Sequence, residues 1–487
     1  MKKAIDFILI NPPSPTGKSS NKDMMGGFGQ LYNAVDDERS TKIPVIDLAY
    51  VCGQCKKEGL NFLVIDGLVE NISFESIVSR IKDRIPEYIF VRTSTPSFEW
   101  DMSMIKKIFD ETYTKIFVFG PHVQQKKEEC IQINEIFGII TSEPEEVIPE
   151  IFSKGLEKTP GIWFKKNNRI IRNKDRPLIT ELDKLEFPAW EFLPYLDYNL
   201  GEQINYAMPF STVLTSRGCP YQCAYCPYPI GQGSRWRARS SSNVVSELKY
   251  LSERFGIRGV LFRDAVFTLN QQRTKEICEG IIKNNLKISW RCETRIDCLT
   301  PDLIRLMRKA GCIGINIGME SFSKEVLSFL GTRPLEKERV FEISKVCDKE
   351  GIALFSFFII GLPRETKKSM MKTISLAKKL NSTYTQFTIA TPYPGTALEK
   401  WARENRFILM EDSKKITGYA CIMKNENLGP KTISLFYKYA NLYVQTNFKN
   451  MTRRIKRRGV LQIPKEMAKL LLSFYYYAKI NMMNEKK

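Results

Sequence analysis

The sequence predicts an α/β protein with two successive parallel-sheet regions and a helical, basic C-terminal region. Apolar runs of strand length alternate with helix-length stretches over residues 1–155, and the same alternation returns over residues 211–395. Continuous apolar strands joined by helices form parallel sheets whose two faces are both covered. The length of 487 residues suits two or three such domains.

The first region, residues 1–155, predicts a Rossmann-like parallel sheet. Its expected strands are Asp6–Ile10, Phe62–Asp66, Tyr88–Arg92, Lys115–Phe119 and Phe137–Ile140, with helices expected at Pro44–Glu58 and Phe98–Thr112. Ligands of such sheets bind at the carboxyl ends of the strands. The loops that fall there are Asn11–Pro13, Thr93–Ser97 and Gly120–His122. Their small hydroxylated residues and glycine allow the backbone to approach a large planar ligand closely.

Residues 156–210 read as a connector. The stretch GIWFKKNNRIIRN predicts a hairpin with its turn at Asn167 and Asn168. The following segment, DRPLITELDKLEFPAWEFLP, carries prolines that argue against long helices.

Residues 211–395 predict a partial (β/α)6 barrel, because six strand-length runs alternate there with helical patterns such as Asn243–Arg254. The expected strands are Thr212–Ser216, Gly259–Arg263, Ile288–Glu293, Gly314–Met319, Leu354–Ile360 and Thr385–Ala390. The chemistry of such barrels belongs at the carboxyl ends of the strands. Residues 396–487 are expected to be mostly helical and increasingly basic.

The charge is concentrated at the C-terminal end. Of the formal net charge of +20, thirteen Lys and Arg against two Glu lie between Pro430 and Lys487. Such a concentration suggests an acidic partner, either anionic lipid or nucleic acid. The alternative is a solubilising tail on a basic protein. Both interpretations stay open at the level of the sequence.

The start of the chain predicts a cytoplasmic protein. Its short apolar run ends at Asn11-Pro12-Pro13, too soon for a signal peptide or a membrane span. Twelve cysteines in such a chain argue for thiols and metal ligation rather than for a disulfide framework. The pair Cys52 and Cys55 falls on one face of a predicted helix, where core packing is expected. Cys292, Cys298 and Cys312 remain unassigned.

The stretch CPYQCAYC places Cys219, Cys223 and Cys226 within eight residues, in the loop after the first strand of the predicted barrel. A structural zinc requires four ligands, and the one histidine of the chain, His122, lies in another region. A 4Fe–4S cluster held by three thiolates keeps one iron without a protein ligand, and that iron can bind a small molecule. Zinc binding or a chance spacing is the alternative interpretation.

The Cx3Cx2C spacing, with the aromatic Tyr225 before the last cysteine, resembles the signature of the radical SAM superfamily. That resemblance implies that the open iron chelates S-adenosylmethionine (SAM). It also implies SAM contacts at the carboxyl ends of later strands, from Asp264, Arg295, Glu320, Gly361 and Pro363. A guanidinium such as that of Arg295 can pair with a carboxylate through two hydrogen bonds. Taken singly, Arg295 or Glu320 could instead form a structural ion pair.

Residues 1–400 resemble the cobalamin-binding branch of this superfamily, including PYPGT at Pro392–Thr396. The resemblance implies a set of cobalamin contacts in the N-terminal sheet, namely Asn11, Thr93, Ser94, Thr95, Ser97, Gly120, Pro121, His122 and Glu143. The DxHxxG signature that supplies a histidine to cobalt in many cobalamin proteins is absent. We therefore expect His122 to contact a tail or a loop rather than to ligate cobalt.

The resemblance implies a cobalamin-dependent C-methyltransferase that uses a 5′-deoxyadenosyl radical and an external reductant of the flavodoxin or ferredoxin type. Cyclisation, rearrangement and dehydratase-like reactions without methyl transfer remain alternatives. A tRNA-modifying methylthiotransferase would need three further cluster cysteines, and the N-terminal region offers only Cys52, Cys55 and Cys130. A non-enzymatic zinc or nucleic-acid-binding protein would need a fourth ligand. Binding of nucleic acid is therefore not expected.

The substrate and the catalytic residues that touch it cannot be assigned from the sequence, beyond a small or lipid-like molecule. The basic cluster RRIKRR at Arg453–Arg458 precedes the aromatic, apolar stretch Lys469–Met483. Together they resemble an interfacial segment that would bring the protein to a membrane surface, as a lipid or polyprenoid substrate would require. The alternative is a C-terminal helix that packs its aromatic face on the barrel.

Overall fold

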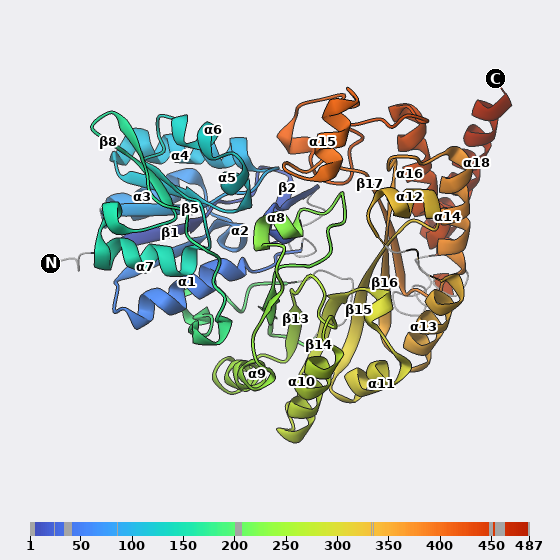
Figure 1. Cartoon of the computed structure of the whole chain (residues 1–487), viewed down its shortest axis with the longest axis horizontal. Coiled ribbons are helices and arrows are strands. Elements are labelled where there is room, and N and C mark those ends of the chain that lie inside the picture. The colour runs from blue at the N-terminus through green and yellow to red at the C-terminus, as the bar shows by residue number, and fades with distance from the viewer. Residues whose placement is uncertain are drawn as a thin grey trace. The chain divides into compact units, whose positions relative to one another are not determined.

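Figure 1 shows the computed structural model of the chain, which describes residues 5–23, 25–33, 41–84, 86–199, 207–332, 334, 336–447, 451–452 and 463–485. The chain packs into two compact units. Unit 1 comprises Met1–Pro220 and Pro227–Ala265, and unit 2 comprises Tyr221–Cys226 and Val266–Lys487. The predicted domain boundaries at residues 155, 210 and 395 stay a prediction.

Unit 1 contains a seven-stranded sheet with the order β4-β1-β5-β6-β7-β8-β9. Its strands are β1 (Phe7–Asn11), β4 (Phe62–Asp66), β5 (Tyr88–Arg92), β6 (Lys115–Phe119), β7 (Gly138–Ile140), β8 (Ile162–Lys166) and β9 (Arg169–Arg172). The first five run parallel to one another. The predicted parallel sheet is confirmed, and β4, β5 and β6 have the predicted bounds.

Alternating residues of these strands serve opposite faces of the sheet. Phe7, Phe90 and Phe117 form a row of rings, in which Phe7 meets Phe90 edge to face at 5.4 Å between centroids and Phe90 stacks on Phe117. Phe152 of helix α7 (Pro144–Lys154) covers that row, 5.5 Å from Phe7. Isoleucines such as Ile8 form the core of the other face.

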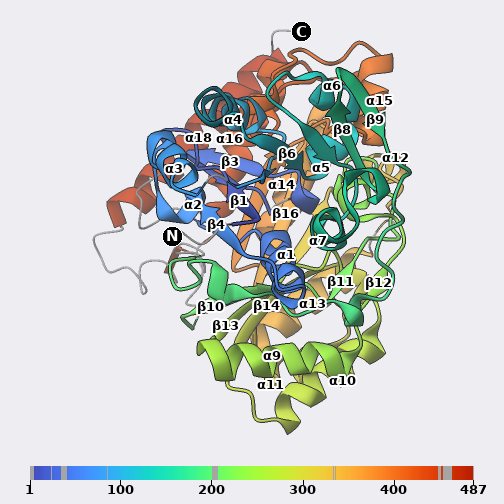
Figure 2. The same ribbon diagram turned by 90° about the vertical axis from the view of Figure 1, so that its left-hand side faces the viewer.

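Helices cover both faces, as continuous apolar strands require. Helix α1 (Ile46–Lys57) lies with α7 on one side, and α3 (Phe74–Lys82) lies with α4 (Phe98–Thr112) on the other (Figures 1 and 2). Cys52 and Cys55 are buried in α1, and burial raises the pKa of both thiols, as core packing requires.

The predicted hairpin of the connector is present as β8 and β9, which pair antiparallel. Asn167 and Asn168 form its turn with φ values of 49° and 58°. Two residues with positive φ give the hairpin turn whose twist matches that of the strands, and asparagine tolerates this conformation well. Strand β8 also pairs antiparallel with β7, so the connector extends the parallel sheet.

A second hairpin, β2 (Lys18–Asn21) and β3 (Gln30–Asn33), was not predicted. The sequence KSSN lacks the apolar alternation that marks a strand. Other short elements of unit 1 are α2 (Gly67–Glu70), α5 (Pro121–Gln125), α6 (Lys127–Gln132), α8 (Tyr228–Gln232) and the one-turn helix η1 (Met25–Gly27).

The predicted β/α alternation of residues 211–395 is confirmed. In unit 1, β10 (Phe210–Val213) pairs parallel with β13 (Gly259–Phe262), and α9 (Ser241–Phe255) lies between them in sequence. The prediction that the first strand runs to Ser216 was wrong. Ser216 and Arg217 form β11, which pairs antiparallel with β12 (Arg237–Ala238) and so turns the chain out of the main sheet.

Unit 2 contains parallel strands in the order β14-β15-β16-β17. Their bounds are Ser289–Thr294, Cys312–Glu320, Ala353–Ile360 and Tyr384–Ile389. The helices of the unit are α10 (Gln271–Lys283), α11 (Pro301–Lys309), α12 (Lys324–Phe329), α13 (Lys337–Lys349), α14 (Lys367–Lys379), α15 (Ala397–Glu404), α16 (Pro430–Gln445) and α18 (Ile463–Glu485). The predicted helical C-terminal region is confirmed.

The sequence predicted a basic interfacial segment and no membrane span. The basic cluster Arg453–Arg458 lies outside the described residues. Among the residues that are described, no helix is long and apolar enough to cross a membrane.

Candidate functional site

The three cysteines of the CPYQCAYC motif differ in how far they are buried. Cys219 is buried, and Cys223 and Cys226 are half-buried. The N–H of Cys219 donates to the carbonyl of Gly233 at 3.1 Å, and the N–H of Cys226 donates to the carbonyl of Cys223 at 2.9 Å. All twelve cysteines lie in the described part of the chain, and none forms a disulfide.

Gly218 fixes the backbone directly before Cys219. Its φ is +79°, and a Cβ built there would lie 2.2 Å from the carbonyl oxygen of Arg235. Only glycine fits both the positive φ and this close approach. The residue therefore sets the turn into the cysteine loop.

The structure does not preform a metal site. Within the described ranges, no three His, Cys, Asp or Glu side chains are grouped as they would be around a metal ion. The three thiols still offer the soft donors that iron–sulfur clusters take. Their role as cluster ligands stays a prediction that rests on their spacing.

Arg295 and Glu320, two of the predicted SAM residues, line one pocket of unit 2 at the ends of β14 and β15. The pocket is lined by Arg295, Ile296, Asp297, Gly318, Met319, Glu320, Leu327 and Thr332. Tyr225, a third predicted SAM residue, donates its hydroxyl hydrogen bond to Oε1 of Glu320. The structure thus brings three predicted residues to one place.

Glu320 is held in an unusual conformation at the end of its strand. Its φ is +53°, and Gly318 leaves the space that its carboxylate fills. Burial raises the pKa of Glu320, although the hydrogen bond from Tyr225 opposes the shift. A non-glycine residue with positive φ marks a local strain that surrounding contacts must offset.

Arg295 is pre-oriented by its neighbours. Its Nε and Nη2 atoms each donate to a carboxylate oxygen of Asp297 at 2.9 Å. The guanidinium also lies 4.2 Å from the ring centroid of Tyr221. Burial works against the charge, but the two bonds to Asp297 raise the pKa of Arg295 overall. The ion pair that the sequence left as an alternative is therefore present.

Asp264 belongs to unit 1 and is fully buried. Its carboxylate accepts hydrogen bonds from the N–H and the Oγ1 of Thr215, at 3.2 and 2.7 Å, and from the hydroxyl of Ser216. These bonds fix the residues that lead into the cysteine loop. A contact of Asp264 with SAM stays a prediction.

Gly361 and Pro363 lie in a buried loop after β16 that is not part of the Arg295 pocket. A Cβ at Gly361 would meet Ile433 of α16 at 2.9 Å. The loop is closed by Glu365, whose Oε2 accepts from the N–H of Gly361 at 2.6 Å.

Sequence reasoning missed Glu365. It is fully buried, and among the described residues its Oε1 has no hydrogen-bond partner. Burial raises its pKa to about 8, against the two backbone N–H bonds that favour the charged form. The available signal was the acidic residue four positions after the glycine that ends the strand.

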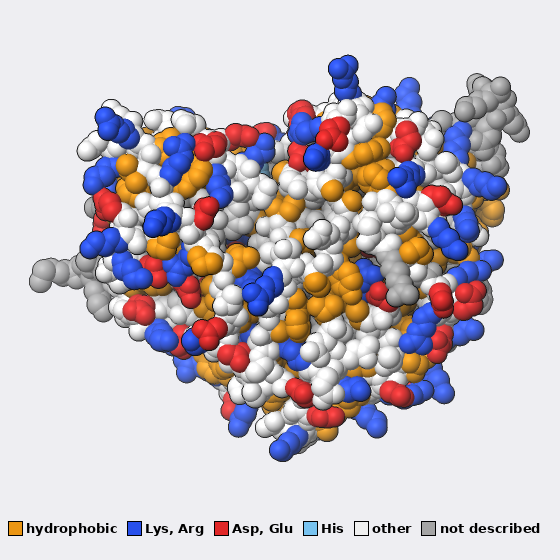
Figure 3. Space-filling model, viewed as in Figure 1, with side chains coloured by type: hydrophobic (Ala, Val, Ile, Leu, Met, Phe, Trp, Pro, Cys, Tyr) orange, Lys and Arg blue, Asp and Glu red, His pale blue; other side chains and the backbone are white. Residues whose placement is uncertain are grey.

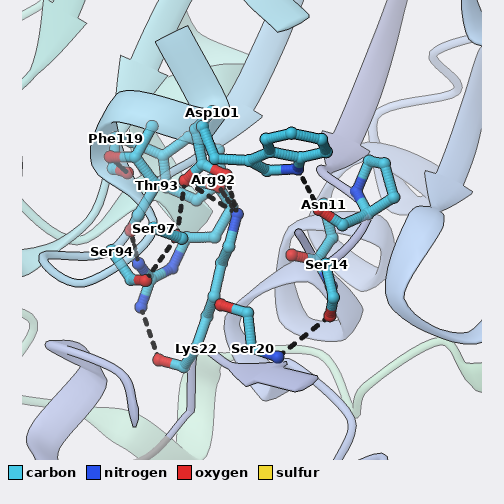
Figure 4. Close-up of polar contacts among 12 residues, drawn as sticks. Asn11, Ser14, Ser20, Lys22, Arg92, Thr93, Ser94, Ser97, Asp101 and Phe119 are labelled. Carbon is cyan, nitrogen blue, oxygen red and sulfur yellow. Dashed lines mark hydrogen bonds and ion pairs between the residues drawn. The ribbon is translucent and has the colours of Figure 1, made fainter. Parts of the chain in front are cut away.

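The hydroxyl-rich loop after β5 is buried and closed on itself (Figure 4). Thr93 donates its hydroxyl to the carbonyl of Phe119 at 3.3 Å, and the hydroxyls of Ser94 and Ser97 lie 2.7 Å apart. Ser97 also donates to Oδ2 of Asp101 at 2.8 Å. The predicted cobalamin contacts Thr93, Ser94, Thr95 and Ser97 are therefore brought together.

The unpredicted hairpin covers this loop. The carbonyl of Phe28, itself fully buried, accepts from the N–H of Thr95 at 3.0 Å. Gly29, at φ +86°, lies so close to Ser94 that a Cβ would stand 2.7 Å from its side chain. The glycines around Phe28 thus allow two backbones to pack against each other.

A buried ion pair, Lys22–Asp101, and the buried side chain of Arg92 anchor the covering segment (Figure 4). Lys22 donates to Oδ1 and Oδ2 of Asp101 at 3.0 and 2.9 Å and to the carbonyl of Arg92 at 2.9 Å. Arg92 donates to Asp47 at 2.7 Å and to the carbonyl of Gly27 at 3.0 Å. Burial lowers the pKa of Lys22 to about 8 despite Asp101. Sequence reasoning did not identify Lys22 or Arg92.

Asn11 stands at the carboxyl end of β1 and is fully buried. Its Nδ2 donates to Asp66 at 2.7 Å, and Tyr198 donates to the other oxygen of that carboxylate at 2.5 Å. Among the described residues, Oδ1 of Asn11 has no hydrogen-bond partner. It is a buried acceptor at the strand end where a ligand is expected.

Gly120, Pro121 and His122 lead from β6 into α5. Gly120 has φ +120°, and a Cβ there would collide with Arg92. The Nδ1 of His122 lies 3.1 Å from the hydroxyl of Thr95, and its ring packs on Phe98 at 4.3 Å. His122 thus contacts the hydroxyl loop. That His122 does not ligate cobalt stays a prediction.

Glu143 lies in a buried ion-pair network rather than beside the hydroxyl loop. It accepts from Arg217 at 3.0 Å and from Arg237 at 2.9 Å. Arg217 also pairs with Glu145 at 2.7 Å. Because Arg217 stands two residues before Cys219, Glu143 anchors the entry to the cysteine loop. Its contact with cobalamin stays a prediction.

His122 should make the free energy of unfolding depend on pH. Burial lowers its pKa to about 4, against about 6.5 in an unfolded chain. Between these values the unfolded chain binds a proton that the folded chain does not, so stability falls as the pH drops from 6.5 towards 4. The expected loss is about 3 kcal/mol relative to His122→Gln, measured by urea unfolding at several pH values.

The single histidine gives an independent check, because its imidazole resonance can be followed by NMR without ambiguity. Neighbouring Lys126 and Glu129 act on the pKa of His122 in opposite directions. A midpoint near 6.5, or a difference from His122→Gln that does not vary with pH, would contradict the burial argument.

The chain is similar to known proteins both in its second β/α region and over most of its length. A model of the radical SAM superfamily matches residues 213–377. The uncharacterized methyltransferase PH0819 of Pyrococcus horikoshii is 31% identical over 482 residues, covering 95% of this chain and 99% of the relative. The anaerobic magnesium-protoporphyrin IX monomethyl ester cyclase of Cereibacter sphaeroides is 25% identical, covering 82% and 66%.

Two solved structures share the fold. The radical SAM methyltransferase TsrM of Kitasatospora setae, with cobalamin and a 4Fe–4S cluster bound, has a TM-score of 0.63 at 18% identity, covering 82% of this chain and 75% of that one. The cobalamin-dependent SAM radical enzyme OxsB, with aqua-cobalamin bound, has a TM-score of 0.70 at 15% identity, covering 99% and 72%. At these identities the likeness shows the fold.

Proposed function

Because this chain belongs to the cobalamin-binding-domain family of radical SAM enzymes, we propose that it transfers a methyl group to an unactivated carbon of a small molecule. The observation that carries the proposal is the match of 95% of the chain to a relative named a methyltransferase. The prediction of an enzyme is confirmed by the family. Cobalamin dependence and the reaction itself belong to the proposal.

Cys219, Cys223 and Cys226 would hold the 4Fe–4S cluster. Their thiols are soft donors outside disulfides, and those of Cys223 and Cys226 are half-buried rather than fully buried. When bound and reduced, the cluster would supply the electron that cleaves SAM to methionine and a 5′-deoxyadenosyl radical. Gly218 and the Arg217–Glu143 pair keep the start of the loop in place, so that the thiols are presented from a fixed turn.

The pocket at the ends of β14 and β15 is where we propose that SAM is recognised. Asp297 occupies the Nε–Nη2 edge of the Arg295 guanidinium and so orients it, and the Nη1–Nη2 edge would pair with the SAM carboxylate. Glu320 offers a carboxylate to an amino or hydroxyl group, oriented by the bond from Tyr225. Both side chains are set before any ligand arrives, which lowers the entropy lost on binding.

One feature of the strand ends of unit 1 supports the proposal that cobalamin binds there. Oδ1 of Asn11 is a buried acceptor without a partner among the described residues, and the corrin ring carries amide donors. Cobalamin would supply the methyl group. Asn11, Gly120 and His122 would approach it from the ends of β1 and β6, and the Lys22–Asp101 pair would keep the hydroxyl loop in shape.

We propose further that a flavodoxin- or ferredoxin-type protein delivers the electron and that the reaction takes place in the cytoplasm. The twelve cysteines, none of them in a disulfide, suit a reducing compartment. A small-molecule substrate is proposed because relatives are named for such substrates, including tryptophan. Cyclisation without methyl transfer is the second candidate, favoured by the similarity to the Cereibacter cyclase.

Anaerobic reconstitution tests the proposal. The chain should take up about four irons with sulfide and then form 5′-deoxyadenosine from SAM when reduced by dithionite. It should also retain a corrinoid through gel filtration. An intact cluster with no retained corrinoid would remove the methyltransferase proposal and leave the radical one, whereas one zinc and no cleavage would refute both.

The SAM pocket is tested in the same assay with Glu320→Gln. Loss of the charged acceptor should raise the KM for SAM about tenfold without changing the iron content. Glu325→Gln is the matched control, because Glu325 is an exposed carboxylate on α12 outside the pocket. An unchanged KM in Glu320→Gln would place the SAM amino and hydroxyl groups away from Glu320.

A further inference from the structure

Helix α18 carries large apolar side chains that face solvent. Eight of those in the described part of the helix are between 43% and 65% exposed: Ile463, Met467, Leu471, Leu472, Phe474, Tyr475, Tyr477 and Met482. Single exposed apolar residues are ordinary on protein surfaces, but a contiguous group on one helix marks an interaction surface.

Six of these residues share one side of the helix. Ile463, Met467, Leu471, Phe474, Tyr475 and Met482 follow one another at steps of four, four, three, one and seven residues. At 3.6 residues per turn they fall within about a third of the circumference and extend over about 28 Å. We call this set the α18 apolar face.

The α18 apolar face is not the side by which the helix packs on its neighbour. Helix α18 contacts α16 within unit 2, and the two run beside each other in Figure 1. Ser473 and Ile480 are buried, and Tyr477 meets Tyr439 of α16 with ring centroids 5.7 Å apart. These residues lie on another side of the helix, so the fold already uses a different face of α18 for packing.

Two exposed lysines of α18 lie outside the apolar face. Lys479 borders the face, with its ammonium 5.9 Å from the ring centroid of Tyr475, and Lys465 lies further round the helix. The sequence from Pro430 to Lys487 has thirteen Lys and Arg against two Glu. By contrast, basic and acidic side chains are intermingled over the face of the molecule in Figure 3.

We propose that the α18 apolar face lies on the surface of an anionic lipid bilayer. An apolar strip with aromatic residues, bordered by lysines, is the pattern of helices that lie in the plane of a membrane interface. The basic character of the C-terminal region attracts anionic headgroups and so fixes the kind of bilayer. The proposal is independent of the reaction and holds for any substrate.

Vesicle co-sedimentation with the full chain tests the surface. The chain should sediment with vesicles of phosphatidylcholine and phosphatidylglycerol, bind vesicles of phosphatidylcholine alone at least tenfold more weakly, and lose affinity as salt screens the headgroups. The double variant Leu471→Glu with Phe474→Glu should reduce the bound fraction at least tenfold, because two charges then face the hydrocarbon.

Ile282→Glu with Tyr113→Glu is the matched control, since both residues are exposed apolar side chains on other elements, 44% and 78% exposed. That variant should bind vesicles as the wild type does, and all variants should keep the wild-type circular dichroism. Failure of the wild type to sediment at any composition would overturn the proposal. So would equal loss in the control, or a double variant that changes only the oligomeric state.

Discussion

Replacing Cys223 by alanine is expected to abolish the formation of 5′-deoxyadenosine and to reduce the iron content of the reconstituted chain from about four atoms to less than one. The reason is that a cluster held by two thiolates has lost one of the three iron ligands that the chain offers. Iron and sulfide analysis, together with product detection after anaerobic incubation with SAM, measures both effects.

Cys421→Ala is the matched control for this variant. Cys421 is also a half-buried thiol of unit 2, and it donates to the carbonyl of Met423 at 3.2 Å outside the motif. Its replacement should leave the iron content and the cleavage rate unchanged. If Cys223→Ala retained full cleavage, the three-cysteine motif would not be the ligand set, whatever metal the wild type contained.

Asp101→Asn is expected to lower the free energy of unfolding by about 3–5 kcal/mol, because it leaves the ammonium of Lys22 buried without a charged partner. Both groups are essentially inaccessible, with side-chain exposures of 1% and 0%. Burial lowers the pKa of Lys22 to about 8 and raises that of Asp101. For each group, the desolvation of the charge therefore outweighs its attraction to the charge of its partner. Urea unfolding measures the loss.

The double variant Lys22→Met with Asp101→Leu tests whether the loss comes from the unpaired charge or from the loss of side-chain packing at this position. Since a well-packed apolar pair often matches a buried ion pair, it should recover all but about 1 kcal/mol of the loss. Asp110→Asn, which breaks an exposed pair with Lys106 at 3.6 Å, should change stability by less than about 1 kcal/mol. Equal losses in Asp101→Asn and Asp110→Asn would contradict the argument from burial.

The parts of the fold that the sequence predicted are those whose information is local. Strand β5 could be bounded to the residue because the run Tyr88–Arg92 is buried throughout and reads as a continuous apolar strand. The turn at Asn167 and Asn168 could also be predicted from the sequence, because asparagine tolerates the positive φ that this turn requires. In both cases the neighbouring residues alone carry the signal.

The parts that escaped prediction depend on partners distant in sequence. Lys22 meets Asp101 across 79 residues, and Arg217 meets Glu145 across 72. An isolated lysine in a stretch such as NKDMM reads as a solvated charge, and only the fold shows that it is buried. The same limit applies to Asp264, whose position at a strand end fits a ligand contact but whose carboxylate is bonded to Thr215.

The connector hairpin also determines what the large sheet presents at its border. Without β8, the short strand β7 would offer its unpaired N–H and C=O groups to any other chain, and its Gly138–Ile140 stretch is fully buried and apolar. The actual border strand is β9, with an exposed arginine at each end, and Arg172 is also paired with Glu128 at 2.7 Å. Charged border strands discourage edge-to-edge association. A fragment that stopped before Gly161 would therefore lose its protection against aggregation, although every parallel strand would still be present.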